Sequence, residues 1–257
     1  MAKVEIPATQ KPEKKLTQIL KKHSGRDSSG KISVRHQGNR QKRYYRIIDF
    51  KRDKKDVEGT VIKIEYDPNR NADIALIEYK DGEKRYILHP TNLNISDIVI
   101  ASEKAEITVG NALPLEAIPV GIEIHNVELY PGQGGIMIRG AGTFGSVIAK
   151  DGHYVHVKLS SGEVRKFSKG CWATVGRVGN IEHKDEEIGS AGRKRLMGIR
   201  PTVRGTAQNP RSHPHGGGEG RSGEGMHAKT PWGKKARGVR TRSKKKWSNK
   251  LIVKRRK

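Results

Sequence analysis

The sequence predicts an all-β core of two small antiparallel domains, flanked by two extended basic arms. Three observations predict it: alternating apolar runs joined by tight-turn pairs, little helical periodicity, and an uneven charge. Only 33% of the 257 residues are hydrophobic, whereas average domains have roughly 45–50% apolar residues by a count that includes glycine. We therefore expect that part of the chain builds no core of its own.

The charge separates the middle of the chain from its ends. The chain has 52 Lys and Arg against 27 Asp and Glu, a net charge of +25. Residues 1–56 hold 17 basic and 6 acidic residues, residues 57–188 hold 14 and 19, and residues 189–257 hold 21 and 2. A polyanion would neutralise such ends and release its counterions. Arms of this length favour a nucleic acid over a solvated tail, a localisation signal or an anionic membrane.

The sequence excludes several classes of protein. The longest run without a charged residue, 86–96, has 11 residues, whereas a membrane-spanning helix needs about 20. The start of the chain lacks the apolar region of a secretory signal. Cys171 is the only cysteine, which excludes an intramolecular disulfide and a multi-cysteine zinc site. We expect a soluble intracellular protein.

The first β-domain begins with alternating residues at 61–66, followed by an Asp-Pro-Asn turn at 67–69. Strand-like runs at 73–80 and 84–88 come next. Asp81-Gly82 separates them, and such a pair between alternating runs is a strong hairpin signal. This part of the chain therefore predicts an antiparallel sheet.

The same arrangement recurs at 146–159, with Asp151-Gly152 as the turn, and Ser161-Gly162 leads into a run at 163–167. The two Lys-Asp-Gly turns are 70 residues apart, too far for a solenoid repeat and suited to two small β-domains. The strand pattern breaks near 114–119. We predict an amino-terminal extension at 1–56, a first barrel at 57–117, a second barrel at 118–196 and a carboxy-terminal extension at 197–257.

Helix is scarce in this sequence. Residues 16–23 could form one short helix, and residues 190–197 another. For the second, Ser190 is a suitable N-cap and Gly198 a suitable end. Beyond Arg200 little periodicity remains, and we expect an extended arm that becomes ordered only on a partner.

The segment 200–221 has the densest pattern of arginine, proline, histidine and glycine. Its glycines allow close approach of the backbone to a ligand, and its arginines can grip phosphate in a bidentate fork. Such a loop suits threading between nucleic-acid strands. A flexible linker is the alternative, but a linker needs neither four arginines nor two histidines.

His213 and His215 leave three interpretations open. With His227 they could form a zinc site, which uses three protein ligands when it is catalytic. His213 could act as a general base, since histidine titrates near neutral pH. No carboxylate or thiol spacing and no nucleophile supports these two, so hydrogen bonding and stacking on RNA is the interpretation we favour.

Three further patterns in the sequence are less specific. Residues 131–135 lack the Gly-Lys-Ser/Thr ending of a phosphate loop and predict a turn between strands. Tyr154, His156 and Lys158 share one strand face, which could touch RNA or simply be a polar exposed face. Basic residues adjoin Tyr44 and Tyr45, a combination that stacks on bases.

Several segments resemble the second protein of the large ribosomal subunit in its bacterial form. They are Tyr44-Tyr-Arg-Ile-Ile-Asp-Phe-Lys-Arg52, Glu65-Tyr-Asp-Pro-Asn-Arg70, Lys80-Asp-Gly-Glu-Lys-Arg-Tyr-Ile-Leu88, Ile118-Pro-Val-Gly121, His125-Asn-Val-Glu128, 189–206, 209–220, Thr230-Pro-Trp-Gly233 and the basic end. The amino-terminal arm looks shorter than in bacterial members, a glycine-rich stretch is reduced to Gly38-Asn39-Arg40, and Trp172 stands where a basic residue is expected. Trp172 could stack on a base or pack on a neighbouring protein.

The resemblance implies an oligonucleotide-binding (OB)-like barrel followed by an SH3-like barrel, with basic extensions buried in ribosomal RNA. It implies a structural, primary rRNA-binding protein of the large subunit near the peptidyl-transferase centre. Such a protein supports assembly, tRNA binding and peptide-bond formation, and contacts small-subunit RNA across an intersubunit bridge. A direct role in peptide transfer has been proposed for the histidine matching His213, but we expect a non-enzymatic protein.

Expected partners are rRNA and neighbouring ribosomal proteins, with no membrane and no small-molecule substrate. We expect a bacterial-type cytoplasmic ribosome and no cofactor, apart from Mg²⁺ ions that could bridge the glycine loop to phosphate. The predicted RNA-binding residues are Arg40, Lys42, Arg43, Tyr44, Arg46, Lys51, Arg52, Arg70, Arg193, Lys194, Arg195, Arg200, Arg204, Arg211, His213, His215, Gly216, Gly217, Gly218, Arg221, Trp232, Lys234, Arg240, Arg242, Lys244, Lys245 and Arg255.

Overall fold

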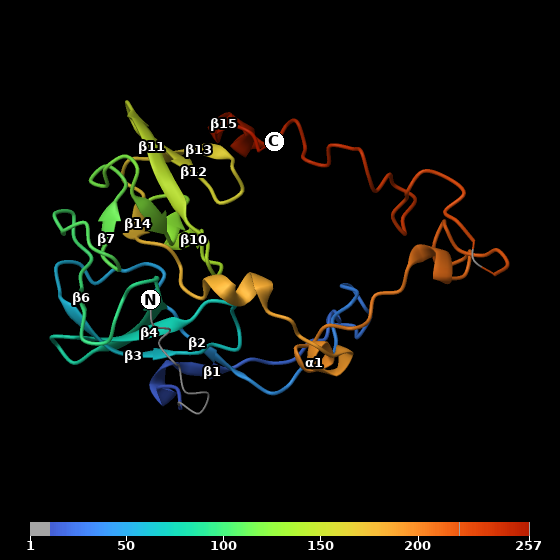
Figure 1. The fold of residues 1–257 in the computed structure, drawn as a ribbon, viewed down its shortest axis with the longest axis horizontal. Helices are drawn as coiled ribbons and strands as arrows, with labels where there is room; N and C mark the ends of the chain where they lie inside the picture. Colours follow the sequence, from blue (N-terminus) through green and yellow to red (C-terminus); the bar gives the residue numbers. More distant parts are fainter. Residues whose placement is uncertain (1–10, 221, 257) are drawn as a thin grey trace. The chain divides into compact units, whose positions relative to one another are not determined.

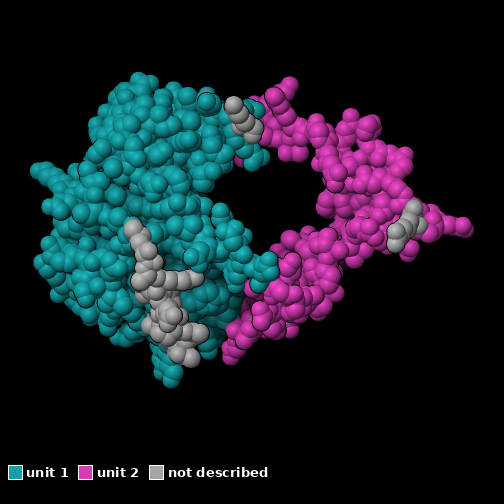
Figure 2. Space-filling view, viewed as in Figure 1, with its two compact units in different colours: residues 1–20, 43–187, 248–257 teal, residues 21–42, 188–247 magenta. Residues whose placement is uncertain are grey.

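The computed structural model describes residues 11–220 and 222–256, and the chain divides into two compact units. The first, here called the barrel unit, takes in residues 43–187 and both chain ends, up to residue 20 and from residue 248. The second, the arm unit, joins residues 21–42 with residues 188–247 (Figure 2). Residues 1–10, Arg221 and Lys257, which belong to the predicted extensions, lie outside the described residues.

The first half of the barrel unit is a four-stranded antiparallel sheet in the order β5-β4-β3-β6. Its strands are β3 (Gly59–Glu65), β4 (Ile74–Tyr79), β5 (Lys84–Leu88) and β6 (Ile98–Val99). The central strand β4 is nearly continuously apolar and is buried on both faces, as expected of a strand covered on two sides. Ala75 and Ile77 pack in one core cluster, whereas Ile74 and Leu76 pack in another with Ile48.

The second half of the barrel unit is a seven-stranded antiparallel sheet in the order β15-β13-β12-β11-β8-β14-β7. Its strands are β7 (Ala112–Pro114), β8 (Glu123–His125), β11 (Gly145–Asp151), β12 (Tyr154–Lys158), β13 (Val164–Ser168), β14 (Trp172–Val175) and β15 (Ile252–Lys254). A two-stranded pair, β9 (Val127–Glu128) and β10 (Gly135–Met137), adjoins it. Figure 1 shows β11, β12 and β13 side by side, in agreement with their pairing.

The predicted all-β class is confirmed, because the chain forms curled antiparallel sheets of the kind found in small barrels. The three predicted tight turns lie between paired strands. Gly82, Gly152 and Gly162 have φ of +78°, +51° and +83° in these turns, a region that glycine enters without a steric penalty. The hairpin β11–β12 turns at Asp151-Gly152, as the sequence predicts.

One of the two predicted helices is present. The only α-helix among the described residues is α1 (Ala191–Leu196), and the Ser190 side chain caps it by accepting a hydrogen bond from the Arg193 N–H. Gly198 follows it with φ +93°. The remaining helical turns are the 3₁₀ segments η1 (Lys14–Leu16), η2 (Ile181–Asp185), η3 (Gly205–Ala207) and η4 (Trp247–Leu251).

The predicted helix at 16–23 is wrong. After η1 the chain forms β1 (Thr17–Ile19), which pairs antiparallel with β2 (Tyr44–Arg46). Leu16 packs on the core cluster of Ile48 and Tyr86, and its carbonyl accepts a hydrogen bond from the Ile47 N–H at 2.9 Å. An isolated helix as short as residues 16–23 is marginal in water. The packing of Leu16 and the pairing of β1 with β2 therefore decide the conformation of this segment.

Both basic ends of the chain are partly attached to the barrel unit. Ile48, from the predicted amino-terminal extension, is buried in the first core. At the other end, β15 pairs with β13, so that Lys254 lies opposite Val164. The expectation of an extended arm throughout 200–257 is therefore wrong for residues 252–254, because the apolar Ile252 and Val253 interrupt the basic sequence and form an edge strand.

No helix within residues 11–220 and 222–256 has the length and apolar character needed to cross a membrane.

His125 is a buried titratable group at the end of β8. Its Nδ1 lies 2.8 Å from the Gly176 carbonyl oxygen and donates a hydrogen bond to it. Burial lowers the pKa of His125 to about 4. In the unfolded chain the pKa returns to about 6.5, so the unfolded state binds more protons between these two values.

We predict that the folded barrel unit loses stability as the pH falls from 6.5 toward 4, by about 3 kcal/mol at most from His125 alone. Above pH 6.5 His125 is neutral in both the folded and the unfolded chain, so it no longer lowers the stability of the folded unit. The measurement is the urea midpoint at neutral and acidic pH. His125→Asn keeps a donor at the Nδ1 position and should flatten the dependence, whereas His153→Asn, at an exposed turn, should leave it unchanged. Equal dependence in the His125→Asn variant would contradict the prediction.

Candidate nucleic-acid interface

The arm unit is held together by backbone pairing between two segments that are far apart in sequence. The His36 carbonyl accepts a hydrogen bond from the Arg200 N–H at 2.9 Å, and the Gly38 N–H donates to the Gly198 carbonyl at 2.8 Å. A side chain at Gly198 would meet the Arg40 side chain at 2.9 Å. Pairing of this kind orders a strongly charged segment without burying its side chains.

Three consecutive basic residues of α1 lie on the surface of the arm unit. Arg193, Lys194 and Arg195 are all exposed, and they occupy the last turn of the helix. Cations at a helix carboxyl end interact favourably with the helix dipole. This short helix therefore presents three charges in a fixed local arrangement, and RNA binding by these residues stays a prediction.

His213 is buried within its own loop. It is only 8% exposed, and its Nδ1 accepts a hydrogen bond from the His215 N–H at 3.0 Å. The ring lies directly against Gly205, where a Cβ would come within 2.5 Å of it. The rings of His213 and His215 are stacked with centroids 5.1 Å apart. His213 thus stabilises the folded loop through its contacts with Gly205 and His215.

His215 joins the glycine loop to the next segment of the chain. It is 7% exposed, its Nε2 accepts a hydrogen bond from the Lys229 N–H at 2.8 Å, and its Nδ1 lies 3.1 Å from the Glu224 carbonyl. A nitrogen that accepts from an N–H carries no proton, so Nδ1 is the donor. Both ring nitrogens of His215 are therefore already used.

These contacts disfavour a metal site formed by His213, His215 and His227. Among the described residues no group of three or more His, Cys, Asp or Glu side chains is placed to hold a metal ion. His227 is exposed, whereas His215 would have to give up its hydrogen bond from Lys229 to bind a metal. The histidine pair is instead a local structural element of the loop.

The three glycines at 216–218 permit close packing inside the loop. A Cβ at Gly216 would come within 2.5 Å of the Asn209 backbone, and Gly217 and Gly218 have φ of +91° and +90°. Their small size is therefore required by the folded loop itself. Arg200, Arg204 and Arg211 are exposed around it, and Arg221 lies outside the described residues.

The remaining candidates of the arm unit and of the chain end are exposed, with one exception. Arg40 is half-buried, and Trp232 is 77% exposed. The exposed basic residues are Lys42, Lys234, Arg240, Arg242, Lys244, Lys245 and Arg255.

The basic and aromatic cluster around Tyr44 is only partly available. Tyr44 is exposed, but Arg46 is 8% exposed and lies 3.9 Å from the Asp67 carboxylate. Arg70 forms an ion pair with Asp67 at 2.6 Å, and Arg43 donates to the Pro68 carbonyl at 2.7 Å. Asp67 and the turn that follows it therefore engage arginines that the sequence assigns to RNA.

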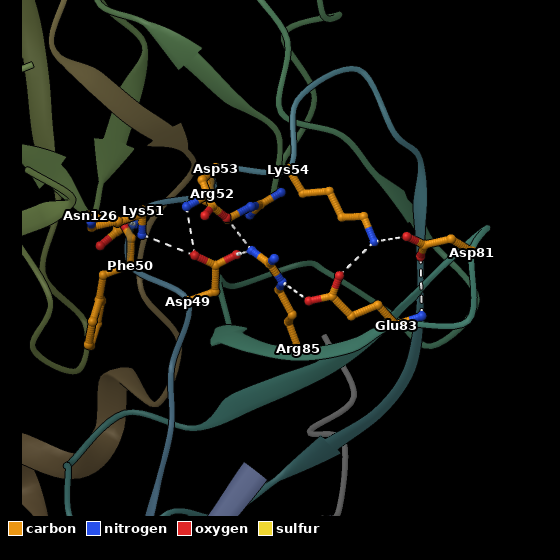
Figure 3. A network of polar contacts seen from close by, with 10 residues as sticks. All are labelled: Asp49, Phe50, Lys51, Arg52, Asp53, Lys54, Asp81, Glu83, Arg85 and Asn126. Carbon is orange, nitrogen blue, oxygen red and sulfur yellow. Dashed lines mark hydrogen bonds and ion pairs between the residues drawn. The ribbon is translucent and has the colours of Figure 1, made fainter. Parts of the chain in front are cut away.

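Lys51 and Arg52 point in different directions, although they are neighbours. Lys51 is exposed, whereas Arg52 is 3% exposed and donates to the Gly110 carbonyl at 3.2 Å. Asp49 accepts hydrogen bonds from both backbone N–H groups, at 3.1 and 2.7 Å (Figure 3). Arg52 thus packs inside the barrel unit, a placement that the alternation of charges in the sequence does not reveal.

A network of acidic and basic side chains attaches this segment to the β4–β5 hairpin (Figure 3). Arg85 contacts Asp49 at 3.0 Å and Glu83 at 2.6 Å, and it also pairs with Asp53. Burial opposes the charge of Arg85, but hydrogen bonds to these carboxylates outweigh it and raise its pKa. The hydrogen bond from Arg85 is the main reason that the pKa of Asp53 is lowered. The charge of Arg85 is therefore neutralised by carboxylates of the same unit.

Two further patterns receive a structural explanation. The turn at 131–135 is organised by the buried Glu128 carboxylate, which accepts hydrogen bonds from the N–H groups of Gly132 at 3.1 Å and Gly134 at 2.8 Å. This confirms a turn, since the protein's own anion occupies the backbone donors. Trp172 lies under the Lys55 ammonium, 4.5 Å from the ring centroid.

The outer strand face of β12 is exposed as predicted. Val155 and Val157 point into the core, whereas Tyr154 and Lys158 are exposed and His156 is half-buried. Arg35 is a residue that sequence reasoning missed. Its guanidinium lies 5.4 Å from the Trp232 ring centroid, a contact between residues nearly 200 positions apart that no local signal could reveal.

Comparison with protein families agrees with this arrangement. Residues 13–101 match the family described as ribosomal proteins L2, RNA binding N-terminal domain. Residues 108–233 match the family described as ribosomal proteins L2, C-terminal domain. The two matches together extend over both barrels and most of the arm unit.

We predict that His215→Ala loosens the connection between the glycine loop and the segment at 229. The half-buried Lys229 N–H would no longer have its acceptor, which costs less than the ~1–3 kcal/mol expected for a fully buried donor. Hydrogen exchange of the Lys229 amide should therefore become faster, while the amides of β4 keep their protection. His227→Ala, which removes an exposed ring, is the matched control. Unchanged exchange at Lys229 in the His215→Ala protein would refute the assigned role.

Proposed function

Because the chain belongs to the ribosomal protein L2 family, and is therefore a structural RNA-binding protein of the large ribosomal subunit, we propose that its arm unit carries most of its affinity for rRNA. The single observation that supports this is the distribution of exposed charge. Residues 189–257 hold 21 basic and 2 acidic residues, and the basic residues described there are mostly exposed.

The arm unit combines this charge with a backbone that is already ordered. The His213–His215 pair, the packed glycines and the pairing of His36 with Arg200 fix local geometry. An ordered arm loses less conformational entropy on binding than a disordered one. In the barrel unit, Arg46, Arg70 and Arg85 are paired with carboxylates of the same unit, so these arginines are less available to RNA.

The proposal includes a position near the peptidyl-transferase centre and early assembly onto large-subunit rRNA. It also includes contact with small-subunit RNA across an intersubunit bridge and support of tRNA binding. The segment 209–220 supports these points through its resemblance to the bacterial form of the family. The same resemblance supports a bacterial-type cytoplasmic ribosome. Mg²⁺ ions are proposed as bridges between the carbonyl groups of the glycine loop and phosphates, and no resident cofactor is proposed.

A structural role for His213 is proposed in preference to general-base catalysis. Its Nδ1 accepts a hydrogen bond from the His215 N–H, and its ring is packed on Gly205. A general base needs a free nitrogen within hydrogen-bond reach of the proton that it removes, and only Nε2 is left for that task.

We predict that affinity for rRNA depends steeply on salt and that the arm residues set the slope. If ten side chains meet phosphates, log K should fall with log[salt] at a slope of about −7 to −9. Replacing Lys244 and Lys245 with Gln should reduce the slope by about one for each phosphate that the variant no longer neutralises. The measurement is a salt titration of binding to purified large-subunit rRNA.

The matched control is the same change at Lys80 and Lys104, two exposed lysines of the barrel unit. Its slope should stay at the wild-type value. Substitutions are preferable to truncation, because removal of the chain end would also remove β15 from the second sheet. If the two double variants reduce the slope equally, the arm unit has no special share in binding and the proposal fails.

We predict that His213→Gln leaves peptide transfer nearly unchanged in fully assembled ribosomes, because glutamine still accepts a hydrogen bond but does not titrate. Assembly or subunit joining is the step that should slow. Single-turnover peptide transfer on purified complete ribosomes, with subunit profiles from the same cells, separates the two effects. A collapse of the transfer rate in complete particles would establish catalysis by His213.

A further inference from the structure

Residues 228–236 form a tight hairpin whose backbone is fixed by its own hydrogen bonds. The Gly233 N–H donates to the Thr230 carbonyl at 2.9 Å, and the Thr230 N–H donates to the Lys234 carbonyl at 2.7 Å. Pro231 suits the second position of such a turn, and Gly233 supplies the positive φ of +77° that closes it. Trp232 is therefore placed at the tip by a rigid backbone and not by packing of its ring.

The Trp232 ring is unusually open for a residue of this size. It is 77% exposed, compared with 52% for Trp247. Its close neighbour is Arg35, whose guanidinium lies 5.4 Å from the ring centroid, within the range of a cation–π contact. Leaving so much apolar area in water is unfavourable, so a partner that covers the ring would gain free energy.

We propose that Trp232 and Arg35 form a stacking site for one unpaired RNA base, with the base on the ring surface that Arg35 leaves open. This deepens the proposed function and rests on it. Aromatic rings and guanidinium planes are the groups on which proteins stack splayed bases. A base on Trp232 would continue a stack that begins with Arg35.

The surroundings of the ring favour RNA over a protein partner. Lys229, Lys234 and Lys235 lie in the same hairpin, and the chain has no acidic residue after Glu224. The phosphates on either side of a stacked base would meet these ammonium groups. The one other apolar residue of the turn is Pro231, which is half-buried, so the turn offers little further apolar surface for a protein to cover.

The site is also connected to the glycine loop. Lys229, at the start of the hairpin, donates its N–H to His215 at 2.8 Å. Arg35 precedes the segment that pairs with Arg200. Both halves of the stacking site are therefore held by hydrogen bonds that involve the backbone, and His215 acts as a positioning residue for one of them.

The test uses the full chain and two probes, a short single-stranded oligouridine and a blunt RNA duplex of the same length. Trp232→Ala should weaken binding of the oligouridine by roughly 5- to 100-fold, the range of stacking contributions measured by alanine substitution. It should leave the salt dependence unchanged, because stacking releases no counterion. Lys234→Gln should instead reduce the salt slope by about one. Val203→Ala, which trims an exposed apolar residue of the same unit, should change neither.

A spectroscopic readout separates stacking from general loss of affinity. In a chain with Trp172→Phe and Trp247→Phe, all tryptophan emission comes from Trp232. Oligouridine should quench it, and the blunt duplex should not. Arg35→Ala should reduce both the quenching and the affinity.

Each of the other possible results would contradict either the stacking site or the proposed function. Salt-dependent binding with no effect of Trp232→Ala and no quenching would refute the stacking site and leave the proposed function intact. Emission that changes only in complete large subunits, with unchanged affinity for RNA, would assign the ring to a neighbouring protein. Failure of the wild-type chain to bind either RNA would refute the proposed function itself.

Discussion

Repulsion among like charges is the constraint on which the arrangement of this chain depends. A segment with 21 basic and 2 acidic residues cannot gather its side chains into a core. The arm unit is ordered instead by contacts that bury backbone: the pairing of His36 with Arg200, the packing of Gly216 on Asn209, and the hydrogen bonds of His215. The charged side chains can then stay in solvent, where a polyanion can reach them.

The barrel unit buries some of its charged side chains and pairs them, whereas the arm unit leaves its charged side chains in solvent. Arg46, Arg52 and Arg85 lie inside or against the sheets, and each is paired with a carboxylate or a backbone carbonyl of its own unit. Burying them unpaired would be costly. This unit also holds parts of both chain ends, through the burial of Ile48 and the pairing of β15 with β13. The arm is therefore attached on both sides to a folded body and is not a free tail.

The two histidines show why residue type alone does not identify a role. A His-Pro-His sequence is compatible with a metal site, a general base, an RNA contact or a loop element. The ring of His213 packs on Gly205, and both nitrogens of His215 have backbone partners. In the proposed function, the exposed charges and Trp232 are therefore the groups that would meet RNA. The histidines set the geometry in which those groups are presented.

Local pattern and composition were enough to predict the all-β class, the hairpins at Gly82 and Gly152, the helix capped by Ser190 and the separation of charge. The family could also be identified from motifs spread along the chain. Long-range packing, by contrast, makes residues 17–19 a strand, buries Arg52 while Lys51 stays exposed, and brings Arg35 against Trp232. Each of these depends on a partner distant in sequence, and strand pairing, burial and ring contacts across such separations leave no signal in the neighbouring residues.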